Sequence, residues 1–220
     1  MATRRKYDDG CAVAHALDLV GERWALLVVR GLLFGPKRFT DLRTSLPGAS
    51  PNVLSQRLRE LEDSGVVRRR KLPPPAATWV YELTEWGREL DPVLTSLGRW
   101  GVRSPSLRPG SEVNADSLML ALKTLYAPAD GQGVTADFQV RVGEDEFRVS
   151  VSADGVDIAR GELDRPDAVV ETDRATFTAL LARDRELGEA VECGDVRLTG
   201  NRESLARFLD LLPPPEPATT

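Results

Sequence analysis

Apolar residues recur at helical spacing along the front half of the chain. Leu54, Leu58 and Leu61 follow the i, i+4, i+7 pattern of one helix face. Ser50 is a favoured N-cap residue, and Pro51 suits the first helical position, where its missing N–H is not needed. The same periodicity predicts helices over residues 13–20, 24–32, 38–46 and 51–64.

The predicted helix over residues 51–64 has a polar face opposite its leucines. This face carries Asn52, Ser55, Gln56 and Arg59, with Arg57 on one flank. Such side chains hydrogen-bond base edges and phosphates, and the N-terminal half of a recognition helix is the part that enters a major groove. An ordinary amphipathic surface helix is the alternative for this segment taken alone.

A basic hairpin is predicted immediately after this helix. Residues 66–72 and 78–83 have the composition of strands, and three consecutive prolines lie between them. The first strand carries Arg68, Arg69, Arg70 and Lys71. A hairpin in this position is the wing of a winged helix, whose cations reach an adjacent minor groove or its phosphates. A charge run that is merely solvated is the alternative, and the neighbouring helix favours the wing.

A wide apolar stripe follows the hairpin. Residues 83–100 predict a long helix that carries Trp86, Leu97 and Trp100 on one side. Proline removes one backbone hydrogen bond, so Asp91–Pro92 should kink or interrupt this helix. Large apolar residues beyond a small DNA-binding core indicate a dimer interface. Packing against the C-terminal half is the alternative, and the two are compatible.

The back half combines strand-like and helix-like patterns. Phe138, Val140 and Val142 alternate with polar residues, and two further runs repeat the alternation, which predicts a three-stranded antiparallel meander. Helical patterns flank these strands, as in an α+β layer. The predicted fold class is therefore α+β. Its parts are a winged helix-turn-helix domain at residues 1–103, a linker at 104–113, an α+β domain with an antiparallel sheet at 114–213, and a disordered tail at 214–220.

The net charge of −5 hides an asymmetry. Residues 1–103 hold 17 Lys and Arg against 12 Asp and Glu, a net charge of +5, whereas residues 104–220 carry −10. A basic front half indicates an anionic partner for that half, and DNA would repel the acidic back half. Arg4, Arg5 and Lys6 form a short basic arm that could lie against phosphates or simply be disordered.

Several classes of protein receive no support. Cys11 and Cys193 are too few for a disulfide scaffold and fit a reducing cytoplasm. With His15 as the single histidine, a zinc site lacks ligands, and no cofactor is expected. The chain has no apolar run of membrane-spanning length, no phosphate-binding glycine loop and no nucleophile elbow, so neither a membrane protein nor an enzyme is expected. His15 is expected to pack among the apolar residues of the first helix.

Four motifs of the front half are shared with a known family. They are LDLVGERW, GPKRF, LPGASPNVLSQRL and YELTEWG, and together they make residues 7–103 closely resemble the HxlR-type winged-helix transcriptional regulators of bacteria. The resemblance implies a dimer, which we expect to be a repressor, on a pseudo-palindromic operator in double-stranded DNA. The DNA-contacting residues that it implies are Arg38, Thr40, Ser50, Asn52, Ser55, Gln56, Arg57, Arg59, Arg68, Arg69, Arg70 and Lys71.

The back half resembles a second family. The runs FQVRV, PDAVVETDRATFTALL and VRLTGN make residues 114–213 similar to a sterol-carrier-protein-like domain. That family encloses an apolar tunnel, which implies an apolar small-molecule effector. The lining would come from Phe138, Phe147, Phe177, Leu181, Leu205 and Phe208. Each of these residues is equally what a solid core needs.

Cys11 offers a further mechanism. Some HxlR-type regulators sense oxidants or electrophiles through a cysteine near the N-terminus, where Cys-Pro is common; here Ala12 follows Cys11. The sequence favours a small buried packing cysteine over a sensor. The leading hypothesis is therefore a ligand-responsive DNA-binding regulator. Three alternatives are a lipid carrier whose winged helix contacts proteins, a thiol switch, and a regulator whose back domain serves only stability or dimerisation.

Overall fold

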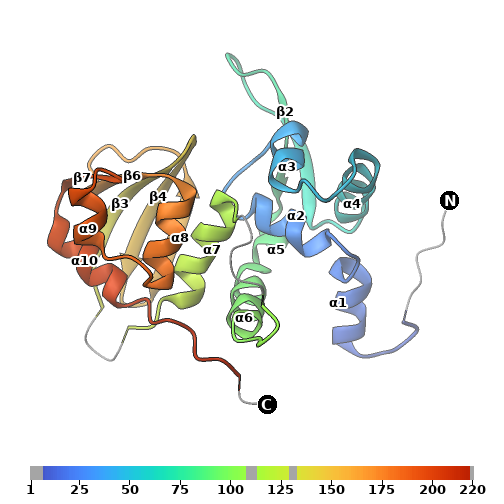
Figure 1. Ribbon diagram of the computed structural model, residues 1–220. Coiled ribbons are helices and arrows are strands. Elements are labelled where there is room, and N and C mark those ends of the chain that lie inside the picture. Colours follow the sequence, from blue (N-terminus) through green and yellow to red (C-terminus); the bar gives the residue numbers. More distant parts are fainter. Residues whose placement is uncertain (1–6, 108–112, 129–132, 219–220) are drawn as a thin grey trace. The chain divides into compact units, whose positions relative to one another are not determined.

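A computed structural model describes residues 7–107, 113–128 and 133–218 (Figure 1). The chain divides into two compact units, Met1–Leu94 and Thr95–Thr220, and this division falls inside a helix instead of at the predicted linker. The predicted basic arm at residues 4–6 lies outside the described residues. None of the helices in the described ranges has the length and apolar character that crossing a membrane requires.

Four helices form the body of the first unit: α1 (Ala12–Val20), α2 (Ala25–Leu32), α3 (Phe39–Ser45) and α4 (Pro51–Asp63). The prediction for α4 is confirmed, because Leu54, Leu58 and Leu61 are no more than 1% exposed and build one side of the core. The Ser50 hydroxyl accepts a hydrogen bond from the Val53 backbone N–H at 3.3 Å, as a helix N-cap does.

The predicted hairpin is present as β1 (Val67–Lys71) and β2 (Trp79–Leu83), which pair antiparallel. Val67 and Leu83 face each other at its base and are buried. Lys37 forms an isolated β-bridge with the hairpin. Its backbone N–H donates to the Tyr81 carbonyl oxygen at 2.9 Å, and its carbonyl oxygen accepts from the Tyr81 N–H at 2.8 Å. The hairpin is therefore tied to the segment that precedes α3.

The long helix predicted over residues 83–100 is interrupted, as its Asp91–Pro92 pair indicates. It forms α5 (Glu85–Arg88) and α6 (Asp91–Gly101). Thr84 caps α5 through a hydrogen bond from the Gly87 N–H at 2.9 Å. Gly87 is required here because a Cβ at this position would lie 2.1 Å from the carbonyl oxygen of Val66.

A five-stranded sheet forms the second unit, with the strand order β5-β4-β3-β6-β7. The strands are β3 (Ala136–Val142), β4 (Asp145–Ser152), β5 (Gly155–Arg160), β6 (Ala168–Thr172) and β7 (Val196–Gly200). The predicted antiparallel meander is confirmed in β3, β4 and β5. The sheet as a whole is mixed and not purely antiparallel. After β5 the chain returns past β4, so that β6 pairs parallel with β3.

Four helices of the second unit lie on one face of this sheet (Figure 1). They are α7 (Ala115–Leu125), α8 (Arg174–Ala182), α9 (Leu187–Glu192) and α10 (Arg202–Asp210). The opposite face is polar and carries Arg141, which bonds Glu146 at 2.9 Å and Glu171 at 2.7 Å. The unit is thus a two-layer α+β arrangement with its apolar core between sheet and helices.

The described part of the predicted tail, residues 214–218, makes two hydrogen bonds with Arg103. Arg103 donates a hydrogen bond through its Nε to the carbonyl oxygen of Glu216 at 3.0 Å. The Ala218 N–H in turn donates to the Arg103 carbonyl oxygen at 2.8 Å. Both bonds lie within the second unit, and disorder of residues 214–220 stays a prediction.

Candidate nucleic-acid interface

The polar row on α4 is built by the helical repeat. Asn52, Gln56 and Arg59 are exposed, and Ser55 is half-buried beside them. Gln56 donates from Nε2 to Glu60 at 3.0 Å, and Arg59 donates from Nε to the Ser55 carbonyl oxygen at 3.3 Å. Because the leucines on the other side anchor the helix in the core, the row is presented on a rigid support.

Arg57 differs from the other α4 residues that the sequence predicts to contact DNA. Its side chain is only 12% exposed and forms ion pairs with Glu60 and, at 3.6 Å, with Glu22. A guanidinium that binds two carboxylates of its own chain stabilises the packing of α4 near the end of α1. The structure therefore gives Arg57 contacts within its own chain, which separates it from the exposed polar row.

Arg38 and Thr40 lie at the start of α3 and are both exposed. The Arg38 backbone N–H donates to the Asp41 carboxylate at 3.0 Å, and the Thr40 hydroxyl donates to the same carboxylate at 3.2 Å. Asp41 is thus a capping acid, since carboxylates in the first helical turn satisfy free N–H groups. The Arg38 side chain remains available at the surface.

The wing separates its four cations onto two sides. Arg68 and Arg70 both donate through Nε to the Glu82 carboxylate, each at 2.7 Å. Arg69 lies on the other side, where its Cζ is 4.6 Å from the centre of the Trp79 ring. Lys71 is paired with Trp79 across the hairpin and is exposed. The sequence alone did not predict a role for Glu82 or Trp79, because only the pairing of the two strands brings them next to the arginines.

Glu82 is an acid buried within a basic wing, with a side chain that is 7% exposed. Burial by itself raises the pKa of this carboxyl group. Hydrogen bonds and charges from Arg70 and Arg68 outweigh that effect, so the pKa lies below its ordinary value. Glu82 is therefore ionised at neutral pH and fixes the two arginines relative to the strand.

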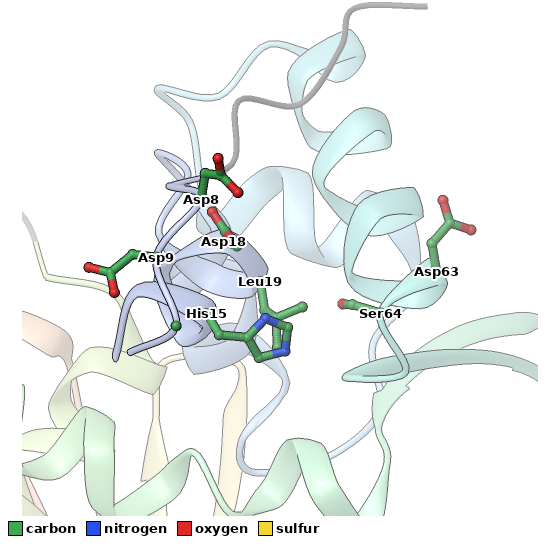
Figure 2. A pocket seen from close by; sticks show the side chains of 8 residues that line it. Asp8, Asp9, His15, Asp18, Leu19, Asp63 and Ser64 are labelled. Carbon is green, nitrogen blue, oxygen red and sulfur yellow. The ribbon is translucent and has the colours of Figure 1, made fainter. Parts of the chain in front are cut away.

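A cavity of about 590 Å³ lies near α1 and the end of α4 (Figure 2). Its lining is acidic and includes His15 at the surface, so the prediction that His15 packs inside is wrong. Four carboxylates make this face unsuitable for DNA. Among the described residues, no group of three or more His, Cys, Asp or Glu side chains is placed to hold a metal ion. The side chains that line the cavity include Asp8, Asp9, His15, Asp18, Leu19, Asp63 and Ser64.

Cys11 is exposed, so the expectation of a buried packing cysteine is also wrong. The apolar neighbours that suggested burial, Val13 and Leu17, are themselves 66% and 42% exposed. Hydrogen bonds from the backbone N–H groups of Ala14 and Val13 lower the pKa of the Cys11 thiol below its ordinary value. Free N–H groups at the start of α1 thus favour the thiolate.

The six residues predicted to line an effector tunnel are all buried in the second unit, at 0–6% exposure. Phe138 and Phe208 stack on each other with ring centres 5.5 Å apart, and Tyr126 lies 5.9 Å from Phe208. These contacts are those of a packed core between sheet and helices. The six residues are Phe138, Phe147, Phe177, Leu181, Leu205 and Phe208.

In comparisons with known proteins, the two halves of the chain match two different families. The family model of the HxlR-like helix-turn-helix matches residues 19–106, and that of the alkyl sulfatase C-terminal domain matches residues 119–218. The second match gives the back half a relative, while its likeness to sterol carriers remains a prediction.

Individual relatives match the front half. The HTH-type transcriptional regulator YvaP of Bacillus subtilis is 41% identical over 85 residues, which are 39% of this chain and 79% of YvaP. The regulator YodB of the same organism is 38% identical over 85 residues, 39% of this chain and 76% of YodB. The solved structure of reduced YodB is 34% identical, covers 46% of this chain and 98% of that chain, and has a TM-score of 0.39.

The winged helix-turn-helix of the first unit agrees with the family model and the sequence relatives. YvaP is 41% identical to this chain over 79% of its own length. The chain belongs to the HxlR-like helix-turn-helix family, and it is a DNA-binding transcriptional regulator.

Proposed function

We propose that this regulator is a cytoplasmic repressor that binds a pseudo-palindromic operator as a homodimer. The observation that carries the proposal is the exposed row of Asn52, Gln56 and Arg59 on α4, followed in the chain by the cationic hairpin. The row has the donors and acceptors that base edges require, and the hairpin has the cations that phosphates attract. The two free cysteines agree with a reducing compartment.

Dimer formation is supported by apolar side chains that the chain leaves exposed. Trp86, Val93, Leu97 and Trp100 on α5 and α6 are between 45% and 76% exposed. Large aromatic and aliphatic residues at this exposure are typical of protein–protein interfaces. Elsewhere on α6, Arg99 donates from Nε to the carbonyl oxygen of Thr124 at 3.2 Å within the second unit.

An apolar effector for the second unit rests on the sterol-carrier resemblance. The packed core of that unit has the apolar character such a molecule requires, and binding would need the core side chains to move apart. A ligand can change the DNA affinity only to the extent that it binds the DNA-binding conformation and the non-binding conformation with different affinities. Native mass spectrometry of protein purified from its own host tests this part, because a co-purifying apolar molecule would identify the effector.

DNA binding is tested with duplexes selected by the protein from a pool with a random core. We expect the selected sequences to contain two related half-sites about one helical turn apart. Asn52→Ala should relax the preference at one base position in each half-site and cost about 1–3 kcal/mol of discrimination there. Arg88→Ala, at an exposed position on α5, serves as the control and should bind as the parent does.

Two results would contradict this proposal. One is a parent protein that enriches no sequence from the pool; the other is an affinity that does not fall as the salt concentration rises. If the protein instead transferred lipid between vesicles while ignoring DNA, the lipid-carrier alternative would be supported.

A thiol-switched regulator is a second candidate, and the exposure of Cys11 favours it. Its lowered pKa raises the fraction of reactive thiolate at neutral pH. A mild oxidant should then change the DNA affinity of the parent but not that of Cys11→Ser. Equal responses of the two proteins would eliminate this candidate.

A further inference from the structure

We propose that Trp79 is a positioning residue for DNA binding: it holds Arg69 in a fixed stack that contacts the sugar–phosphate backbone. The inference rests on the proposed function of the wing and refines it. Sequence patterns gave all four wing cations the same role, whereas the hairpin divides them into two classes with different surroundings.

The strand register creates the stack. Arg69 pairs across the hairpin with Tyr81, and Lys71 pairs with Trp79, so these four side chains lie on one side of the wing. The Arg69 guanidinium carbon lies 4.6 Å from the centre of the Trp79 ring and 5.9 Å from that of Tyr81. Trp79 is still 50% exposed. We name Arg69, Lys71, Trp79 and Tyr81 the aromatic face of the wing.

The other side of the wing has less free charge. Arg68 and Arg70 share the carboxylate of Glu82, so three charged groups have a net charge of +1. The aromatic face carries Arg69 and Lys71, and among the described residues Arg69 has no carboxylate partner. A polyanion is therefore attracted more strongly to the aromatic face than to the side that contains Glu82.

Stacking suits Arg69 for phosphate binding. A guanidinium group that lies on an aromatic ring keeps its N–H groups at the edge, where they can bond two phosphate oxygens. The stack also restricts the side chain before DNA arrives, so less conformational entropy is lost on binding. Figure 1 shows that the β1–β2 hairpin projects from the helices of its unit.

Affinity for a selected duplex and for an unrelated duplex of the same length tests the proposal. Arg69→Ala should weaken both by about tenfold, because a charge-assisted hydrogen bond is lost. It should also reduce the slope of log affinity against log salt by about 0.9. Trp79→Ala should weaken binding by about threefold, the value of an exposed cation–π contact. Trp79→Phe, which keeps an aromatic ring, should restore most of the loss.

Two variants separate positioning from general damage. Arg69→Lys keeps the charge but cannot stack as a planar group, so it should lose affinity while the salt slope stays near the parent value. In an Arg69→Ala background, Trp79→Ala should cause no further loss, since the residue on which it acts is absent. Arg68→Ala is the matched control and should have a smaller effect than Arg69→Ala, because Glu82 neutralises part of its charge.

Additive losses from Arg69→Ala and Trp79→Ala would overturn the inference, as would a Trp79→Ala variant that binds as tightly as the parent. Circular dichroism of each variant checks that the hairpin and helices are intact. Binding by the parent protein shows whether the inference alone fails or whether the proposed function fails as well. If it binds neither duplex, DNA binding itself is wrong; if it binds while the aromatic-face variants are unaffected, only the role of Trp79 and Arg69 is wrong.

Discussion

Glu82 has two opposing effects at the scale of single residues. It stabilises the wing by holding Arg68 and Arg70, each at 2.7 Å, and it reduces the positive charge that the wing offers to DNA. If the wing binds DNA as proposed, this buried acid affects the free energy of folding and the DNA affinity in opposite directions. Removing its charge should separate the two.

For Glu82→Gln we expect a loss of about 1–3 kcal/mol in the free energy of unfolding at neutral pH, because two charged hydrogen bonds are weakened. DNA affinity should rise, since the wing gains one net positive charge. The pKa of Glu82 in the folded protein lies below its ordinary value of 4.5. Its contribution to stability is thus complete above that value and is lost as the pH falls through the lowered pKa.

Urea denaturation of both proteins across the acid range measures this effect. The parent and Glu82→Gln should differ most at neutral pH and converge as the carboxyl group becomes protonated. A constant difference at all pH values would show that the variant loses packing and not charge. Arg88→Ala is again a suitable control, because its pH dependence should follow that of the parent.

The pKa of the Cys11 thiol can be measured from the rate of its alkylation. The backbone N–H groups of Ala14 and Val13 lower its pKa, so its alkylation by iodoacetamide should reach half its maximal rate below the ordinary thiol pKa of about 8.5. The measurement needs a Cys193→Ser background, because both cysteines are exposed. A midpoint at or above the ordinary value would contradict the predicted influence of the α1 N-terminus.

At the scale of elements, Ser50 separates helix capping from DNA binding. Ser50→Ala removes the acceptor of the Val53 N–H and should lower the free energy of unfolding by about 1 kcal/mol. Ser50→Asp keeps a capping oxygen and should retain stability, yet its carboxylate should weaken DNA binding through repulsion of the phosphates. Thermal unfolding should therefore show lower stability for Ser50→Ala than for Ser50→Asp. The affinity for a DNA duplex should fall in Ser50→Asp.

If Ser50→Asp bound DNA as tightly as the parent, the start of α4 would lie away from the duplex. Asn52→Asp provides the matched control. It places the same charge two residues further along, on an exposed residue that is not the N-cap of the helix. A loss at Asn52 but not at Ser50 would shift the DNA-contacting part of the helix toward its middle.

The sequence predicted those elements whose signals are local. The α4 helix has its cap, its first-turn proline and its three leucines within one short segment, and the meander of β3 to β5 has tight turns. Pairings between distant segments were not predictable. The bridge between Lys37 and Tyr81 and the parallel pairing of β3 with β6 depend on tertiary contacts that no local pattern contains.

The candidate site shows the same division. Asn52, Gln56 and Arg59 could be named from helical periodicity, and the structure leaves them exposed. Arg57 fits that periodicity equally well, but Glu22, which lies outside α4, makes it part of the packing. The errors at Cys11 and His15 also have a common cause: periodicity predicts that α1 has an apolar side but not whether its own chain covers that side.

For the whole molecule, the exposed apolar residues of α6 predict the oligomeric state. Leu97→Glu combined with Trp100→Glu places two charges among side chains that are 45% and 76% exposed in the single chain. Loss of a central tryptophan contact should weaken dimerisation by more than about thirtyfold. DNA affinity should fall with it, because two half-sites are no longer bound by one particle.

Sedimentation velocity over a range of concentrations measures the effect: we expect the parent to sediment as a dimer and the variant as a monomer. Leu27→Glu, which alters an apolar residue that is 37% exposed on α2, is the control and should leave the assembly unchanged. A variant that sediments as the parent does would place the interface elsewhere, for example around Val13 and Leu17 of α1.

The position of β6 between β3 and β7 has a consequence for the order in which the two units fold during synthesis. The sheet stays incomplete until the chain has been made as far as Gly200, because β7 pairs only with β6 and β6 joins it to β3. The first unit needs only residues up to Leu94. At ordinary rates of translation the interval is on the order of ten seconds. We therefore expect the wing and its recognition helix to form while the acidic unit is still unfinished, so the nascent chain acquires its DNA-binding surface first.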